Sequence, residues 1–182
     1  MEKNKLGMLF FISSEAIFFI LLILAYMILH NNVLPGQPTA VSTLDPLKTG
    51  FFSLFLFASS FTIWQAEKSL VRENGRFSRW LAATIALGFI FLLGQGIEWA
   101  NLIGQGVTVS VNTFGTAFFT MTGFHGLHVL VGLLGLAILL GMTVRGGFRG
   151  PHAPSFTAMS YYWHFVDAVW VVIFGVVYLT LV

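Results

Sequence analysis

The sequence contains no cysteine, and charged residues make up only 9% of its 182 residues. The absence of cysteine excludes disulfides, thiolate metal sites and cysteine nucleophiles. A soluble domain usually carries about 25% charged residues, so a soluble fold of this composition would have too little polar surface to cover its core. The formal net charge of +2 is too small to indicate a nucleic-acid-binding protein. The composition therefore favours a membrane protein over an unusually apolar soluble domain.

The hydrophobic residues, 57% of the chain, are concentrated in long apolar segments. About 20 residues of α-helix cross a hydrocarbon core roughly 30 Å thick. We therefore predict an all-α fold, a single domain over residues 1–182 that forms a bundle of five transmembrane helices. The expected spans are 6–29, 49–66, 80–103, 114–144 and 157–182, of which the second is short. The first is too long for the apolar part of a signal peptide and is expected to be retained.

The cationic residues are divided unequally between the two ends of these spans. Lys48 alone falls on one side. The other eight fall on the opposite side: Lys3, Lys5, Lys68, Arg72, Arg76, Arg79, Arg145 and Arg149. By the positive-inside rule, we expect a cytoplasmic N-terminus and an external C-terminus. The charged segment 67–79 and the Gly/Pro-rich segment 145–154 are expected to form cytoplasmic loops.

Ionisable residues inside the predicted spans each cost about 2.5–3.5 kcal/mol on insertion scales, so they should face the bundle interior. They are Glu15, Glu98, His125, His128, His164 and Asp167. Counting 1.5 Å per residue from the span ends places all except Glu98 near the membrane midplane. An i, i+3 spacing joins His125 with His128, and His164 with Asp167. This spacing permits Glu15 to meet a histidine of the fourth span, and Asp167 to orient His164.

Several kinds of site are compatible with this layer of ionisable residues. It could be a structural polar network, a haem site with histidines from two helices, or a proton or ion path. A metal site built from Glu15, His125, His128 and Asp167 is a further alternative. No Glu-x-x-His repeat of the di-iron type occurs, and no inverted repeat indicates a proton-coupled carrier. Spacing alone leaves the choice open.

Glycine and tryptophan give weaker indications. The fourth predicted span is rich in glycine, which favours close packing of helices in lipid. Trp64, Trp80, Trp99 and Trp163 lie towards span ends, where an interfacial aromatic belt would place them. Trp170 is deeper and is expected to pack internally.

Four segments carry a family resemblance. Residues 114–129 read FGTAFFTMTGFHGLHV, residues 161–170 read YYWHFVDAVW, residues 11–19 read FISSEAIFF, and residues 95–99 read QGIEW. All four closely resemble segments of subunit III of haem–copper terminal oxidases, the subunit 3 family of cytochrome c and quinol oxidases. They follow the order of that family and extend over nearly the whole chain. In this resemblance, Glu15 matches a buried, carbodiimide-reactive glutamate, and the chain is similar to the five-helix bacterial form.

The resemblance implies a multi-pass subunit of the bacterial plasma membrane with no catalytic residue, haem, copper or other metal of its own. Its implied partners are the catalytic subunit I, which carries haem and copper and reduces oxygen to water, and subunit II. The chain would stabilise subunit I and support proton and oxygen delivery, with bound phospholipid. Glu15, Glu98, His125, His128, His164 and Asp167 would then form a buried polar network. Arg145 falls near a basic lipid-headgroup ligand of the family.

Two other functions remain from the sequence alone. The chain could be an accessory subunit of a nitric oxide reductase, since related five-helix proteins accompany those enzymes. It could also be a self-contained haem or metal membrane protein. The electron donor and the haem type of a partner leave no mark in this sequence.

Overall fold

The computed structural model describes residues 3–29, 40–72, 75–145 and 154–179. Every regular element in these ranges is helical. The elements are α1 (Lys3–Leu29), α2 (Ala40–Thr43), α3 (Pro46–Val71), α4 (Phe77–Gly104), α5 (Thr113–Val144), α6 (Pro154–Phe174) and the π-helical turn η1 (Gly175–Leu179). Five of these helices are long and apolar enough to cross a membrane. The predicted all-α bundle with five transmembrane helices is confirmed.

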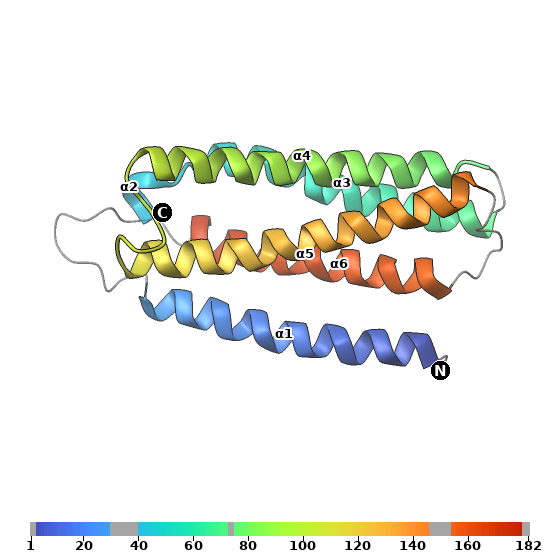
Figure 1. The fold of residues 1–182 in the computed structure, drawn as a ribbon, viewed down its shortest axis with the longest axis horizontal. Helices are drawn as coiled ribbons and strands as arrows, with labels where there is room; N and C mark the ends of the chain where they lie inside the picture. Colours follow the sequence, from blue (N-terminus) through green and yellow to red (C-terminus); the bar gives the residue numbers. More distant parts are fainter. Residues whose placement is uncertain (1–2, 30–39, 73–74, 146–153, 180–182) are drawn as a thin grey trace.

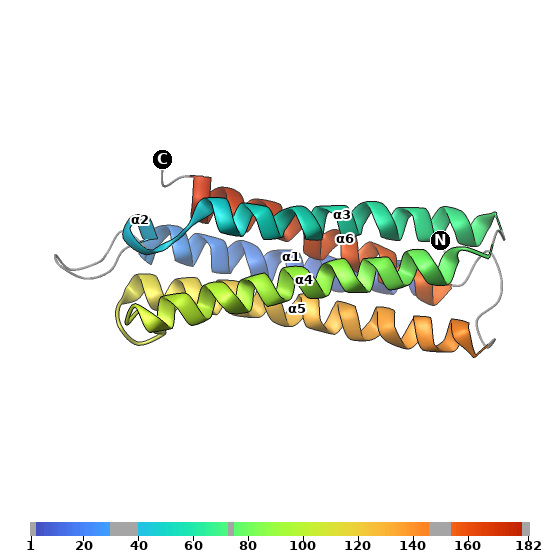
Figure 2. The same ribbon diagram turned by 90° about the horizontal axis from the view of Figure 1, so that it is seen from above.

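The helices form three layers (Figures 1 and 2). The antiparallel hairpin of α3 and α4 makes one layer, and α5 and α6 make the middle one. Helix α1 lies on the far side of that middle layer and packs on both α5 and α6. Few residues of α1 are buried, and most of its large apolar side chains face outward.

One end of the bundle carries the N-terminus, the α3–α4 turn, the end of α5 and the start of α6 (Figure 1). Five cationic residues of the described chain belong to these segments: Lys68, Arg72, Arg76, Arg79 and Arg145. Lys48 belongs to the first turn of α3, at the opposite end. Arg149 and the side chains of Lys3 and Lys5 lie outside the described residues. The described cations are therefore divided between the ends as the sequence predicts.

Helix α3 is longer at both ends than the apolar segment 49–66 indicates. It begins at Pro46 after Asp45, whose side chain accepts a hydrogen bond from the backbone N–H of Lys48. That hydrogen bond, together with the nearby Lys48 ammonium, lowers the pKa of the Asp45 carboxyl. The far end continues to Val71, so part of the expected loop 67–79 is helical. The charged residues Glu67 and Lys68 end the apolar segment. They do not end the helix, because Glu and Lys are good helix formers.

The turn between α4 and α5 is set by one glycine. Gly106 has φ +81°, a conformation that glycine adopts without steric cost. The backbone N–H of Gly106 donates to Ile103 O at 3.0 Å, and that of Val107 donates to Leu102 O at 2.9 Å. These two bonds form a Schellman motif, and the buried Leu102 and Val107 supply its hydrophobic contact. They end α4 at Gly104, and eight residues, 105–112, separate it from the start of α5 at Thr113.

Trp163 lies in the core, and its predicted place in an interfacial belt is wrong. Its side chain is 0% exposed, and Nε1 donates to Ser59 Oγ at 2.9 Å. The space for the indole comes from glycines: a Cβ added to Gly88 or Gly132 would lie 2.7 or 2.8 Å from its ring. Trp170 is also buried, as expected, and donates to Ser53 Oγ at 2.8 Å. Two indoles of α6 therefore fix its position against α3.

Candidate functional site

Glu15 and His128 join α1 to α5 in the middle of both helices. His128 Nε2 lies 3.0 Å from Glu15 Oε2, the contact that the sequence spacing permits. The two side chains are 14% and 23% exposed, so the pair is largely enclosed. The other ring nitrogen, Nδ1, lies 2.7 Å from the carbonyl oxygen of Phe124. Both nitrogens of His128 therefore have a partner.

These two contacts fix the number of protons in the pair. A carbonyl oxygen only accepts hydrogen bonds, so Nδ1 of His128 must carry a proton and donate it to Phe124. A single further proton is then available between Nε2 and Oε2. The pair is either a neutral histidine with a protonated glutamic acid, or an imidazolium with a carboxylate.

Aromatic rings surround this pair. The Phe19 ring stands edge-on to the His128 imidazole with centroids 4.9 Å apart, and the Tyr162 ring stacks at 6.5 Å. Tyr162 Oη donates to the backbone oxygen of His128 at 3.0 Å. The pair thus connects α1 to α5, and the tyrosine connects α5 to α6. This is a polar junction of three helices inside an aromatic shell.

His125 does not join this junction, although it lies one turn from His128. Its side chain is 0% exposed, and neither ring nitrogen has a hydrogen-bond partner among the described residues. The imidazole stacks on Trp170 with centroids 4.8 Å apart and stands edge-on to Phe91 at 6.0 Å. The Phe19 ring of α1 lies edge-on to both histidines, with centroids 6.4 Å from His125 and 4.9 Å from His128. The i, i+3 spacing therefore gives the two histidines a shared aromatic neighbour but no shared hydrogen-bond partner among the described residues.

Asp167 and His164 meet through a residue that the sequence interpretation missed. Ser60 on α3 donates to Asp167 Oδ2 and lies 3.2 Å from His164 Nδ1. The expected orientation of His164 by Asp167 is thus replaced by a bridge through a hydroxyl group. The signal was present: Thr49, Ser53 and Ser60 follow one helical face of an apolar span. Each of them bonds a polar side chain of another helix.

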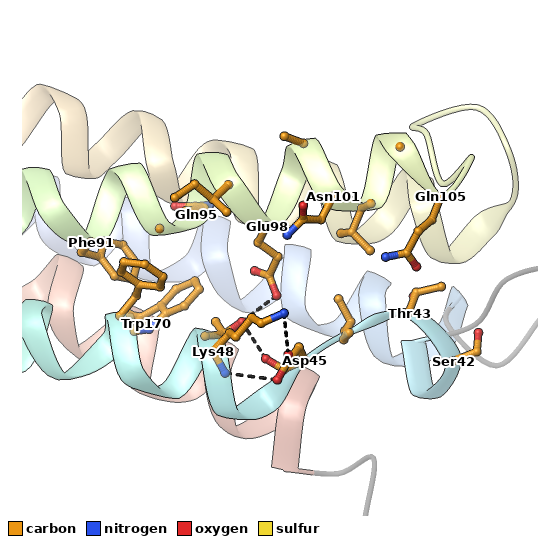
Figure 3. Close-up of a pocket in the computed structure, with 18 residues that line it drawn as sticks. Ser42, Thr43, Asp45, Lys48, Phe91, Gln95, Glu98, Asn101, Gln105 and Trp170 are labelled. Carbon is orange, nitrogen blue, oxygen red and sulfur yellow. Dashed lines mark hydrogen bonds and ion pairs between the residues drawn. The ribbon is translucent and has the colours of Figure 1, made fainter.

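Glu98 stands apart from the other ionisable residues, as its depth predicts. It lines a cavity of about 650 Å³ between the start of α3 and the end of α4, at the open end of the α3–α4 hairpin. Thr49 Oγ1 donates to Oε1 at 2.6 Å, and Tyr178 Oη donates to Oε2 at 2.8 Å. Figure 3 shows Glu98 projecting from α4 towards Asp45 and Lys48, which form an ion pair at 3.2 Å. Glu98 therefore ties α3, α4 and η1 together.

Arg145 is the C-cap residue of α5, and its side chain is exposed. Its backbone N–H donates to Gly141 O at 3.2 Å. The end of α5, which Arg145 caps, lies at the same end of the bundle as the α3–α4 turn (Figure 1). Its assignment as a lipid ligand stays a prediction.

The described geometry gives no support to a cofactor site made by these residues. No three His, Asp or Glu side chains within the described ranges come close enough to share a metal ion. The four residues of the alternative metal site, Glu15, His125, His128 and Asp167, do not converge. Glu15 contacts His128, Asp167 contacts Ser60, and His125 has no hydrogen-bond partner among the described residues. Haem ligation fits no better, because both nitrogens of His128 are engaged and His125 is enclosed by aromatic rings.

Comparison with known proteins gives a consistent result over the length of the chain. Residues 1–181 match the family described as cytochrome c oxidase subunit III. A probable cytochrome c oxidase subunit 3 of Mycobacterium leprae is 36% identical over 178 residues, covering 96% of this chain and 86% of that protein. The corresponding protein of Nocardia farcinica is 36% identical over 181 residues with the same coverage. The cytochrome c oxidase subunit 3 of the fish Gadus morhua is 35% identical over 183 residues, covering 96% of this chain and 68% of the relative.

These matches agree with the four sequence segments and with the bundle of membrane-spanning helices. The segments bearing Glu15, Glu98, His128 and Asp167 all lie within the matched range. The chain belongs to the cytochrome c oxidase subunit III family, as a multi-pass membrane subunit of a haem–copper oxidase.

Proposed function

We propose that this chain acts as a non-redox brace for the catalytic subunit I of a bacterial haem–copper oxidase, with subunit II in the same complex. Haem and copper would be held by subunit I, which reduces oxygen to water. The junction of Glu15, His128 and Tyr162 carries the proposal, because it joins three helices through polar contacts and offers no open ligand position. The proposed role is to keep subunit I stable and to support its proton and oxygen delivery.

The outward face of α1 is consistent with such a role. Its exposed side chains are large and apolar, among them Phe10, Ile17 and Ile28. In a bilayer such a face contacts either lipid tails or another transmembrane helix. The junction holds α1 in a fixed position, so this face is presented in one orientation. Bound phospholipid would fill the surface that subunit I leaves uncovered.

Mild detergent extraction with a tag on this chain tests the assignment. We expect a haem- and copper-containing polypeptide to co-purify, and we expect the chain itself to be colourless once it is separated from that partner. A Soret band on the separated chain would contradict the proposal. So would a partner with iron in place of copper at its binuclear centre, since that is the composition of a nitric oxide reductase.

We also propose that the end of the bundle bearing Arg145 faces the cytoplasm, because cationic residues are retained on that side. The cysteine-free sequence allows single thiols to be placed just before and just after α5, on opposite sides of the membrane. In intact cells, a membrane-impermeant maleimide should label Ser110→Cys and should reach Arg145→Cys only after permeabilisation. Both positions are exposed, so access and not burial decides the result. The opposite labelling pattern would reverse the orientation.

A further inference from the structure

The cavity beside Glu98 is larger than the tie between α3, α4 and η1 requires. Its volume of about 650 Å³ lies in the range of small-molecule sites. The rings of Phe91 and Trp170 line one end, with centroids 4.8 Å apart, and the amides of Asn101 and Gln105 line the other (Figure 3). The Glu98 side chain projects between these two ends. Both amide residues are exposed and both aromatic residues are 1% exposed, so the amide end is the mouth of the cavity.

Glu98 is the carboxyl group of this cavity that has no cationic partner. Asp45, which also lines the cavity, forms an ion pair with Lys48 at 3.2 Å. The two partners of Glu98 are the neutral hydroxyl groups of Thr49 and Tyr178. Within the described ranges, no lysine, arginine or histidine lies within ion-pair distance of Glu98. An ionisable residue inside a span calls for a partner, so a cation for Glu98 would have to come from outside the described chain.

We propose that this cavity binds a free amphipathic organic cation, a guanidinium or ammonium group on an apolar stem, with the cation at Glu98 and the stem towards Phe91 and Trp170. Such cationic groups carry N–H donors and no acceptor, which suits a site that offers a carboxyl group and two amide oxygens. A guanidinium can also bond both oxygens of a carboxylate through parallel N–H groups. The aromatic end accommodates the apolar stem.

The shape of the cavity favours a free molecule of this kind over two other cations. A metal ion takes oxygen ligands and would leave the aromatic end unused. An arginine or lysine side chain of a neighbouring subunit would enter through the mouth, so its stem would lie beside Asn101 and Gln105 and not against the aromatic rings. A separate molecule can place its cation in the middle of the cavity and its apolar part at the buried end.

This site does not rest on the brace proposed for subunit I. It lies at the open end of the α3–α4 hairpin and shares no residue with the junction of Glu15, His128 and Tyr162. Complex formation is measured by co-purification and ligand binding by protection of a thiol, so the failure of one proposal can be told from the failure of the other.

The test measures protection of a single thiol at the mouth of the cavity. The chain has no cysteine, so Gln105→Cys can be followed on it within its co-purifying complex. The complex is placed in phosphatidylcholine nanodiscs, because the quaternary ammonium of choline has no N–H to donate. The rate of maleimide labelling is measured with increasing concentrations of hexylguanidinium or hexylurea, two probes of similar shape that differ in charge.

We expect hexylguanidinium to slow labelling at a roughly 10-fold lower concentration than hexylurea, because a hydrogen bond between charged groups is stronger than one to a neutral group. Glu98→Gln keeps the size of the side chain and removes its charge, so it should bring hexylguanidinium down to the level of hexylurea. Ser110→Cys is the control thiol. It is exposed and lies outside the lining of the cavity, so neither probe should change its labelling.

The comparison of the two probes on Gln105→Cys decides the question even if Glu98→Gln does not accumulate in membranes. The proposal is overturned if the two probes protect equally, or if neither protects. Undiminished protection by hexylguanidinium in Glu98→Gln would also overturn it. So would a Gln105→Cys thiol that is unreactive before any probe is added, since a neighbouring subunit would then already fill the cavity.

Discussion

Replacing Glu15 with alanine is expected to release this chain from its oxidase while leaving initial oxygen reduction intact. The substitution removes Glu15 Oε2, the hydrogen-bond partner of His128 Nε2 on α1, and leaves that nitrogen unpaired in an aromatic shell. A buried polar group without a partner costs about 1–3 kcal/mol. This corresponds to roughly a 5- to 150-fold weaker association if α1 must hold its position for the complex to form.

The measurement is the amount of subunit I recovered with the tagged chain, compared with oxygen consumption in the first turnovers. His128→Ala should behave like Glu15→Ala, because it removes the same contact between α1 and α5. Loss of the haem spectrum or of initial activity in either variant would contradict a bracing role. The decline should instead appear as inactivation over many turnovers.

Glu15→Gln is the matched control, and it also tests the proton count. A glutamine amide can donate to Nε2 just as a protonated carboxyl does, while Nδ1 keeps its bond to Phe124. We therefore expect Glu15→Gln to assemble nearly as well as the wild type. If it is as weak as Glu15→Ala, the native pair is an imidazolium and a carboxylate rather than two neutral groups.

Replacing Gly132 with valine is expected to destabilise the bundle by about 1–3 kcal/mol. A Cβ at this position would lie 2.8 Å from Trp163 Cε3 and 3.3 Å from Tyr162 Cε1. Trp163 cannot move aside easily, because Gly88 encloses the same ring from α4 and Ser59 holds its Nε1. The substitution would therefore force α5 and α6 apart at the level of the polar junction.

Gly141→Val provides the control for this substitution. It makes the same change in the same helix, at a position where a new Cβ would have nothing within 4 Å. The change in helix propensity is the same for both variants, so any difference between their stabilities reports the packing of the new side chain. Thermal stability of the purified complex, followed by the loss of this chain from it, should fall for Gly132→Val and stay close to wild type for Gly141→Val. Equal losses would show that packing against Trp163 is not limiting.

Much of the architecture could be predicted because hydropathy and charge are local properties. The five spans and the unequal division of cations follow from counting residues, and both agree with the described fold. The ends of α3 lie beyond the apolar segment, because Asp45 caps the helix and Pro46 suits its first turn. Charge at Glu67 and Lys68 marked the end of the apolar segment without marking the end of the helix.

The contacts between helices were harder to predict, because they depend on which faces meet. The sequence placed Glu15 and His128 at similar depth, but it could not separate His125 from them, since rotation about α5 decides that. Ser60 carried no charge to attract notice, although it is the link between Asp167 and His164. Trp163 was misplaced because its position near a span end resembles a membrane interface, whereas Gly88 and Gly132 make room for it inside.

The junction also has a consequence for biosynthesis. Glu15 and His128 are separated by 113 residues, which a ribosome adds in roughly 6–23 s. During that interval α1 is made and inserted, but the helices that it packs on, α5 and α6, do not yet exist. Glu15 therefore enters the bilayer before its partner His128 has been made. Helix α1 can therefore complete its packing only after α6 has been made, so its position in the bundle is decided late in synthesis.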